Sequence, residues 1–545
     1  RTNQKSRACL TVSGRVVRMT DIVVFGGLVL DGTGNPWFKA DLGVTQGRIA
    51  MIGNLRSEDA TTRISAEGLA VAPGFVDMHS HSDDALLINP KAESKIRQGV
   101  TIEVIGNCGD SGAPINETIK EEMKKTGAAL ISAGVRVDYS TLQEYARKLE
   151  RQGISVNVAP LIGHGNLRKM AVGYGDRPPT RKELERMRDI LAGAMRQGAF
   201  GMSTGLIYPP GSYSKTAEIV ELAKVASSFG GIYTSHIRGE GETLLKAVKE
   251  AITIGEKAKI PVEISHHKAG GKRNWGKVKQ SIKMIEGARA RGIDVTCDVY
   301  PYVASSFGLV NMLPQWAHEG GPEKITWRLK DPRTKGRMRR DMLKGALSSA
   351  HWDRTMIAQC PRHPEYQGKF VADITKARRE DPFEFAFNLL IEEKLAVGVV
   401  RFGMCEDDVE YVIRYPNAMI GSDGSALAPY GPLGRGHPHP RNFGTFPRVL
   451  GHYARERGII TLPDAVRKMT SLPAQKLGLR DRGVIRPGAW ADVVIFNPKT
   501  VIDVATYGNP KRYPRGIEYV IVNGVLTLSR GKHTGAMAGK VLKRS

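Results

Sequence analysis

The chain has 545 residues, 41% of them hydrophobic, so it is long enough to bury one large core or several smaller ones and is neither fibrous nor wholly disordered. It contains no uninterrupted apolar run of the roughly 18 residues that a membrane-spanning helix requires, and residues 1–18 contain no hydrophobic stretch typical of a secretory signal. We therefore expect a cytoplasmic protein without a membrane partner, and the five scattered cysteines argue against a disulfide framework.

The formal net charge of +25 would suit a nucleic-acid-binding protein, but most of it is confined to three segments. Residues 1–18 and 528–545 each carry five basic residues and no acidic ones, and residues 322–345 carry nine basic against three acidic residues. Sixteen of the 25 charges therefore lie in two end segments and one internal segment. No RNA-binding motif, paired zinc ligands or basic region with heptads accompanies them. We interpret the charge as solvated surface and expect no nucleic-acid partner.

Both ends of the chain have the pattern of short β-strands. Residues 20–31 contain two apolar pieces around Gly26-Gly27, and a similar pattern returns at residues 492–496 and in a predicted hairpin at residues 519–526. We predict that the two ends build one small β-sandwich domain that brackets a larger middle domain. The predicted divisions are residues 1–19, a disordered extension; 20–72 and 479–530, the two parts of the small β domain; 73–478, the middle domain; and 531–545, a basic tail.

The middle domain alternates predicted strands with amphipathic helices. The clearest helix covers residues 180–197, where Thr180 and Glu183 form a capping box and Gly198 marks the end. Eight strand-helix units predict an α/β fold of the (β/α)8 TIM-barrel type, with catalytic groups at the carboxyl ends of the strands. The gap at about 303–381 is too long for one helix, so we predict an insertion over the barrel mouth. The predicted strands cover residues 74–78, 101–106, 156–162, 200–206, 231–235, 261–265, 294–300 and 418–422.

The first predicted barrel strand leads into Asp-Met-His-Ser-His-Ser-Asp-Asp, residues 77–84. In an extended strand, residues i and i+2 point to the same side, so His79 and His81 would lie about 6 to 7 Å apart along the backbone. Two imidazoles in this register can share one metal ion. The alternative is a pair of ordinary surface histidines at a strand end.

Four other predicted strands also end in residue types that bind metals. Cys108 follows the second strand in Gly-Asn-Cys-Gly, His236 ends the fifth, His266 ends the sixth, and Asp423 ends the eighth in Gly-Ser-Asp-Gly. Because the carboxyl ends of barrel strands meet at one face, we predict that these residues join the two histidines in a metal centre. His164, after the third strand, is expected to support that centre or to face the substrate. A nucleophilic Cys108 is disfavoured, because so many nearby imidazoles favour metal binding.

Together these motifs resemble a known family. The D-x-H-x-H-x-D start, the Gly-Asn-Cys-Gly loop, Ser-His-His-Lys at residues 265–268, the Gly-Ser-Asp-Gly turn and His-Pro-His-Pro-Arg at residues 437–441 are similar to N-acyl-D-amino-acid deacylases (D-aminoacylases) of the amidohydrolase superfamily. The resemblance runs from about residue 20 to residue 526. It implies zinc-dependent hydrolysis of the amide bond of a small-molecule substrate, an N-acyl-D-amino acid.

The resemblance also implies how the metal is held. It assigns a tight zinc site to Cys108, His236 and His266. It assigns a second, weaker site to His79, His81, Cys108 and Asp423. Relatives that act on cyclic amides bridge two metals with a carboxylated lysine in the fourth strand, but residues 201–206 contain no lysine. Cys108 takes that place in the deacylases.

The expected mechanism is hydrolysis without a covalent intermediate. Zinc would lower the pKa of a water molecule and polarise the amide carbonyl, and Asp423 would take the proton and pass it to the leaving amine. Lys268 and Arg441 suit the α-carboxylate of the substrate. The loop at residues 425–436 is longer than in compact family members, so Arg435 is an alternative to Arg441. The residues that the resemblance assigns to substrate binding are Tyr208, Lys268, Tyr300, Ser306 and Arg441.

Two further hypotheses compete with the deacylase. Another amidohydrolase, acting on a cyclic amide or a dipeptide, is disfavoured for cyclic amides by the missing lysine. A non-catalytic barrel that serves as a binding or scaffold protein should have lost metal ligands, whereas all six are present. The sequence gives no indication of the acyl group, the preferred side chain or the oligomeric state.

Overall fold

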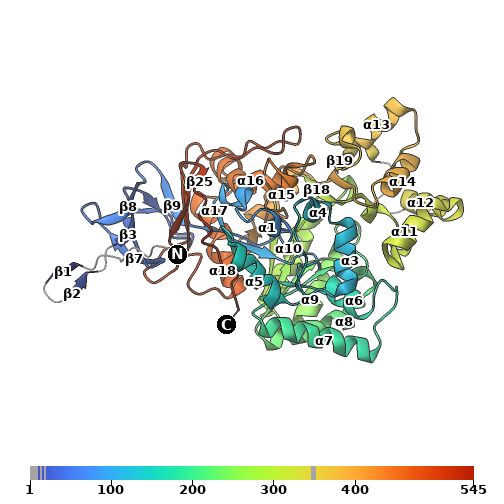
Figure 1. Cartoon of the computed structure of the whole chain (residues 1–545), viewed down its shortest axis with the longest axis horizontal. Helices are drawn as coiled ribbons and strands as arrows, with labels where there is room; N and C mark the ends of the chain where they lie inside the picture. The colour runs from blue at the N-terminus through green and yellow to red at the C-terminus, as the bar shows by residue number, and fades with distance from the viewer. Residues whose placement is uncertain (1–9, 13–14, 18–19, 345–350, 545) are drawn as a thin grey trace.

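A computed structural model describes residues 10–12, 15–17, 20–344 and 351–544 (Figure 1). The strands at the two ends of the chain lie together at one end of an elongated molecule, and the insertion lies at the opposite end (Figure 1). The barrel lies between them. No helix within the described ranges is both long enough and apolar enough to cross a membrane.

Eight parallel strands form the barrel, as predicted. Each pairs with the next in chain order, and the ring closes where Ser80, just after the first strand, forms a parallel bridge with Gly424, just after the eighth. The backbone N–H of Asp423 also donates to the carbonyl of His79 over 2.7 Å. The (β/α)8 fold class is therefore confirmed. The strands are β10 (Phe75–Asp77), β11 (Val100–Ile105), β12 (Asn157–Pro160) continued by β13 (Ile162–Gly163), β14 (Gly201–Gly205), β15 (Ile232–His236), β16 (Val262–Ile264), β17 (Val295–Val299) and β21 (Ala418–Ile420).

Amphipathic helices surround the barrel and bury their apolar sides against it. In α7 (Arg181–Arg196), Thr180 and Glu183 form the predicted capping box, and Met187 and Leu191 are fully buried. The other α-helices described outside the insertion are α1 (Ala85–Ile88), α2 (Glu93–Ile96), α3 (Glu117–Thr126), α4 (Ala128–Ser132), α5 (Leu142–Gln152), α6 (His164–Ala171), α8 (Thr216–Ser228), α9 (Leu244–Ala258), α10 (Lys277–Ala290), α15 (Glu406–Arg414), α16 (Arg441–Arg448), α17 (Leu462–Met469) and α18 (Ser471–Leu477).

The small domain is a β-sandwich built from both chain ends, as predicted. Val24 and Ile49 from one sheet share a hydrophobic core with Ile495 and Ile521 from the other. Strand β9 (Ala70–Pro73) pairs with β22 (Val493–Phe496) and thereby joins the two parts of the chain. One sheet has the order β7 (Arg48–Gly53), β6 (Asp41–Thr45), β3 (Thr20–Phe25), β8 (Ala60–Ser65), and the other β25 (Lys532–His533), β24 (Val525–Ser529), β23 (Ile517–Val522), β22 (Val493–Phe496), β9 (Ala70–Pro73), β4 (Leu28–Val29), β5 (Phe38–Lys39).

The two end segments differ from a simple extension and tail. Strands β1 (Leu10–Val12) and β2 (Arg15–Val17) pair with each other, whereas the rest of residues 1–19 lies outside the described residues. At the other end, the backbone N–H groups of Gly539 and Leu542 donate to the carbonyls of Ile154 and Val158, each over 2.7 Å. The basic tail is therefore a strap that runs along the amino end of the barrel. The buried Val541 packs there, but its burial was not predicted because basic residues surround it in the sequence.

The insertion forms a separate layer with its own core and extends beyond the predicted end at residue 381. Strands β18 (Ala304–Gly308), β20 (Gly398–Phe402) and β19 (Thr355–Gln359) form an antiparallel sheet in that order. Phe383 and Leu390 of α14 (Pro382–Glu392) pack into the core of the insertion rather than against the barrel, so the insertion ends only after β20. Its helices are α11 (Gly321–Lys330), α12 (Pro332–Lys344), α13 (Val371–Arg378) and α14 (Pro382–Glu392).

Candidate metal centre

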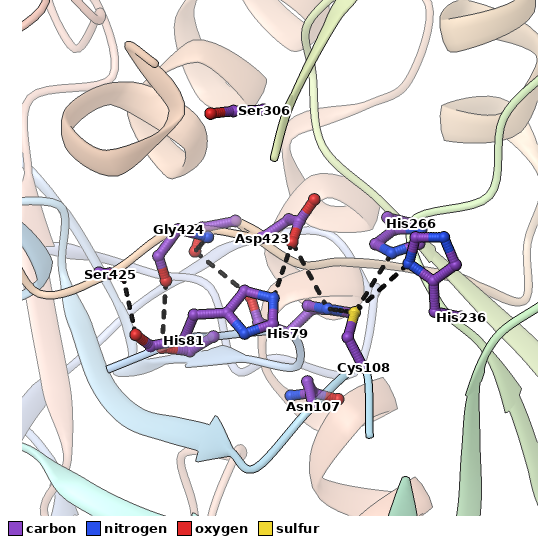
Figure 2. Close-up of polar contacts among 12 residues, drawn as sticks. His79, His81, Asn107, Cys108, His236, His266, Ser306, Asp423, Gly424 and Ser425 are labelled. Atoms are coloured by element: carbon purple, nitrogen blue, oxygen red, sulfur yellow. Dashed lines mark hydrogen bonds and ion pairs between the residues drawn. The ribbon is translucent and has the colours of Figure 1, made fainter. Parts of the chain in front are cut away.

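The six predicted metal ligands converge at the carboxyl ends of the barrel strands (Figure 2). Cys108, after β11, lies at the middle of the cluster. Its Sγ atom is 3.3 Å from His79 Nε2, 3.6 Å from His236 Nδ1 and 3.4 Å from His266 Nε2. On the other side, Asp423 Oδ1 is 3.0 Å from His81 Nε2 and 3.6 Å from His79 Nε2. The side chains meet although their strands are far apart in the sequence.

These side chains form two groups that share the cysteine. Within each group, all candidate ligand atoms lie within 4.8 Å of one another. One group offers a thiolate and two imidazoles, and the other adds a carboxylate to a thiolate and two imidazoles. The first group consists of Cys108, His236 and His266, and the second of His79, His81, Cys108 and Asp423.

Two carboxylates, one fully buried and one partly buried, orient the histidine rings. Asp298, inside β17, lies 3.3 Å from His79 Nδ1, and Glu240 Oε1 lies 3.0 Å from His266 Nδ1. Because each carboxylate contacts Nδ1, the Nε2 atoms of His79 and His266 are turned toward Cys108. Such carboxylate partners fix the tautomer and the direction of metal-binding histidines. Sequence reasoning missed both residues, although Asp298 stands out as an acid within an apolar strand.

The electrostatics of the cluster favour charged ligands. Burial alone would raise the pKa of the Cys108 thiol, but the imidazoles of His79 and His266 outweigh burial and hold that pKa well below its usual range. Burial would likewise raise the pKa of Asp423, but the Arg441 guanidinium and nearby imidazoles hold it well below the usual value. Both shifts favour the anionic form of the group, which metal ligands and proton acceptors require.

Three of the candidate ligands have a left-handed backbone. The φ angles are 53° at Cys108, 35° at His266 and 50° at Asp423. This conformation costs a side-chain-bearing residue about 1 to 3 kcal/mol and persists where the surrounding structure imposes it. The backbone turns at these strand ends therefore aim the side chains at a common point.

The fourth strand makes room for the cysteine loop. A Cβ atom on Gly205 of β14 would lie 2.0 Å from the Cys108 carbonyl oxygen, so only glycine fits there. The close approach brings Cys108 to the centre of the barrel mouth. The loop that carries Cys108 therefore packs against the fourth strand, in which cyclic-amide relatives were expected to carry a lysine.

A buried polar network holds the first and eighth strands together beneath the ligands. Lys95, fully buried in α2, contacts Asp77 Oδ2 over 2.5 Å, Ser422 Oγ over 2.7 Å and the Gly424 carbonyl over 3.2 Å. The Ser422 N–H donates to Asp77 Oδ1 over 2.8 Å. These contacts fix the turn that presents Asp423. Sequence reasoning missed Lys95, because a lysine on a short helix normally faces water.

Of the predicted substrate-binding residues, the two cations lie next to the ligands. Arg441, at the start of α16, contacts Asp423 Oδ2 over 2.7 Å. Lys268 contacts Glu240 Oε1 over 2.5 Å and His266 Nδ1 over 2.8 Å. Arg435, the alternative to Arg441, is exposed.

The three predicted neutral residues surround this cluster. The Tyr208 ring lies 4.8 Å from the His236 ring, centroid to centroid. The Arg441 guanidinium carbon lies 4.9 Å from the centre of the Tyr300 ring. The carbonyl of Ser306 accepts from Arg441 Nη2 over 3.3 Å, and in Figure 2 Ser306 lies apart from the ligands. Tyr208 and Tyr300 therefore border the cluster, whereas Ser306 contacts it through its backbone.

His164 lies behind the cluster rather than in it. Its Nε2 atom is 2.9 Å from Glu218 Oε1, and Arg168 contacts the other oxygen of Glu218 over 2.6 Å. All three side chains are buried. This agrees with a supporting role and does not place His164 among the ligands.

The donor set fits zinc. A thiolate with imidazole nitrogens is the combination that zinc prefers, and a site with three protein ligands leaves a position for catalysis. Cys108, His236 and His266 provide this combination, with His266 oriented by Glu240. The second group, with its carboxylate, fits a further metal ion beside the first.

Comparisons with known proteins agree with this geometry. The chain matches the amidohydrolase family over residues 62–321 and 367–528. It is 38% identical over 525 residues to the D-aminoacylase of Alcaligenes xylosoxydans xylosoxydans, covering 96% of this chain and 98% of that protein. It is also 38% identical over 524 residues to the N-acyl-D-glutamate deacylase of the same organism, covering 96% of each.

A solved structure shows the same likeness. The crystal structure of N-acyl-D-glutamate deacylase from Bordetella bronchiseptica, complexed with zinc and a phosphonate mimic of the tetrahedral intermediate, matches with a TM-score of 0.81 and 37% identity. The match covers 96% of this chain and 100% of that chain. The chain therefore belongs to the amidohydrolase family and, within it, to the D-aminoacylase group of N-acyl-D-amino-acid deacylases.

Proposed function

We propose that this protein is a zinc-dependent deacylase that hydrolyses N-acyl-D-amino acids to a carboxylate and a free D-amino acid. The observation that carries the proposal is the Cys108, His236 and His266 group, with Asp423 directly across the cluster and bound to Arg441. The D configuration of the substrate is inferred from the names of the relatives described above, D-aminoacylase and N-acyl-D-glutamate deacylase.

Cys108, His236 and His266 would hold the tight zinc ion, and His79, His81, Cys108 and Asp423 a weaker one. Zinc supplies Lewis-acid chemistry in such sites, because it polarises a carbonyl and lowers the pKa of water toward neutrality. The protein residues account for the rest. Asp423 is anionic and buried, so it can take a proton from the attacking water and return it to the leaving nitrogen.

Arg441 has two functions in this proposal. Through Nη1 it holds Asp423 ionised and oriented, at 2.7 Å from Oδ2. Its guanidinium presents five donors in a planar fork, so the remaining donors can bind the substrate α-carboxylate. Lys268, which is paired with Glu240, is a second cation beside the cluster. An anionic substrate would thus be placed with its amide beside Asp423 and Cys108.

The competing hypotheses have less support. Residues 201–206, which contain β14, include no lysine to bridge two metals, which disfavours the cyclic-amide chemistry of the lysine-bearing relatives. A scaffold protein has no use for the convergent ligands and their carboxylate partners. A nucleophilic Cys108 would need one histidine base, whereas three imidazoles surround its Sγ atom.

The proposal is tested with purified protein, N-acetyl-D-methionine and the matching N-acetyl-D-methioninamide, which lacks the carboxylate. We expect rapid hydrolysis of the acid and slow hydrolysis of the amide, because the amide lacks the negative charge that the remaining guanidinium donors of Arg441 would bind. A chelator should abolish the activity and added zinc should restore it. Equal rates for acid and amide, or activity that resists chelation, would contradict the proposal.

A further inference from the structure

A cavity of about 300 Å³ lies between the insertion and the barrel. Its barrel side is formed by Tyr174, which follows α6, and Pro209, which follows β14. Its other side belongs to the insertion. The volume is at the lower end of the range of small-molecule sites, which is about 300 to 1,000 Å³. The insertion residues that line it are Val310, Asn311, His318, Pro322, Ile325, Lys394, Leu395 and Ala396.

Two hydrogen bonds join the insertion to the barrel beside this cavity. The N–H of Gly320 donates to the Tyr174 carbonyl over 3.2 Å, and the Tyr213 hydroxyl donates to the Gln315 carbonyl over 3.1 Å. The two contacts fall on barrel segments that follow the third and fourth strands. The cavity is therefore part of the folded interface between the insertion and the barrel mouth.

The lining suits an apolar group. Pro209, Val310, Ile325, Leu395 and Ala396 present hydrocarbon to the cavity. Burial lowers the pKa of His318 to about 4, so this imidazole is neutral at pH 7. Lys394 is the only lysine, arginine or acidic residue of the lining, and it is exposed.

The position of the cavity relative to the metal centre indicates which part of a substrate would reach it. Lys268, Tyr300 and Arg441 follow the sixth, seventh and eighth strands, so the carboxylate-binding side of the site lies there. Pro209 and Tyr174 follow the fourth and third strands, across the barrel mouth. Pro209 also directly follows Tyr208, whose ring contacts that of His236.

In an N-acyl amino acid, the carboxylate and the acyl chain lie on opposite sides of the scissile amide. With the carboxylate bound on the side of strands six to eight and the amide at the metal ligands, the acyl chain must extend toward strands three and four. We propose that this cavity is an acyl subsite, which receives the hydrocarbon chain of N-acyl-D-amino acids with acyl groups longer than acetyl. The inference rests on the proposed deacylase function and adds the class of acyl group.

The test measures kcat/KM for N-acetyl, N-butyryl, N-hexanoyl and N-octanoyl derivatives of one D-amino acid. We expect kcat/KM to rise with chain length, by at most roughly four-fold for each methylene that becomes buried. Ala396→Leu and Ala396→Trp fill the cavity in two steps. They should shorten the preferred chain progressively while leaving kcat/KM for the N-acetyl substrate within about two-fold, because that substrate does not reach the cavity.

Ala377→Trp is the matched control, because Ala377 is an exposed alanine of the insertion that does not line the cavity. It should leave the chain-length profile unchanged. The rate with the N-acetyl substrate shows whether each variant is folded. If Ala396→Trp misfolds, Ala396→Leu still tests the proposal. A flat or falling profile in the unaltered protein, or Ala396 variants with an unaltered profile, would overturn the acyl subsite and leave the deacylase function standing. Failure to cleave any derivative would overturn both.

Discussion

Arg441 and Asp423 form a buried ion pair in which Nη1 lies 2.7 Å from Oδ2, while the other carboxylate oxygen, Oδ1, lies 3.0 Å from His81 Nε2. Each oxygen of the carboxylate therefore has its own partner. The Arg441 guanidinium lowers the pKa of Asp423, and the contact with His81 orients the carboxylate toward the other candidate metal ligands. This arrangement suits a group that takes up a proton only briefly during a reaction.

Asp423→Asn keeps the shape of the side chain and removes its basicity. We expect this variant to retain most of its zinc, because Cys108, His236 and His266 form a group without Asp423. Its kcat should fall by roughly 10² to 10⁴, the usual effect of losing a general acid or base. Metal analysis and kcat measured on the same preparation check this. A parallel loss of zinc and activity would instead make Asp423 a principal ligand.

The two cations at the site should affect substrate binding more than metal binding. Lys268→Ala should raise KM strongly with normal zinc content, because His266 keeps its contact with Glu240. Arg441→Ala should raise KM and also lower kcat, because Asp423 loses its ion-pair partner. Arg435→Ala is the control, since this exposed arginine should leave both constants unchanged. The assignment fails if Arg435→Ala raises KM and Arg441→Ala does not.

Cys108 is the ligand that the two metal groups share. Cys108→Ala should therefore lose both zinc and activity. Cys405→Ala is a matched control, because Cys405 is a free cysteine of similar partial exposure outside the cluster. The measurement compares the zinc content and the turnover number of the two variants. Normal zinc and turnover in Cys108→Ala would disprove the thiolate ligand.

The insertion is expected to act as a lid. It carries the basic helices α11 and α12, and its strand β18 contacts Arg441 through the Ser306 carbonyl. Trypsin cleavage within residues 322–344 should slow when substrate or product binds. Cleavage in α7, where Arg181 is exposed, serves as the reference and should not change. Equal cleavage of the insertion with and without saturating ligand would remove the lid interpretation.

The sequence was enough to predict the barrel and the convergence of the candidate metal ligands, because both depend on local patterns. Each barrel strand is a short apolar run, and His79, Cys108, His236, His266 and Asp423 each stand at or just beyond such a run. Parallel strands in a barrel bring their ends together, so the cluster follows once the strands are recognised.

The partners of the ligands could not be predicted in the same way. Glu240 and Lys95 lie outside the strands, and their contacts with His266 and Asp77 depend on how distant segments pack. The packing of the strap at residues 534–544 was not predicted, because the segment is basic and one buried valine gives no periodic hydrophobic pattern. The end of the insertion was misjudged because α14 is as apolar as a barrel helix.

Comparison of the two enantiomers of one substrate tests the central claim most directly. With the carboxylate held by Arg441 and the carbonyl at the metal ligands, inversion at the α-carbon moves the side chain from its pocket into the wall. The measurement is kcat/KM for N-acetyl-D-methionine and N-acetyl-L-methionine on zinc-loaded protein. We expect the D form to be cleaved far faster, and comparable values for the two forms would contradict the deacylase assignment.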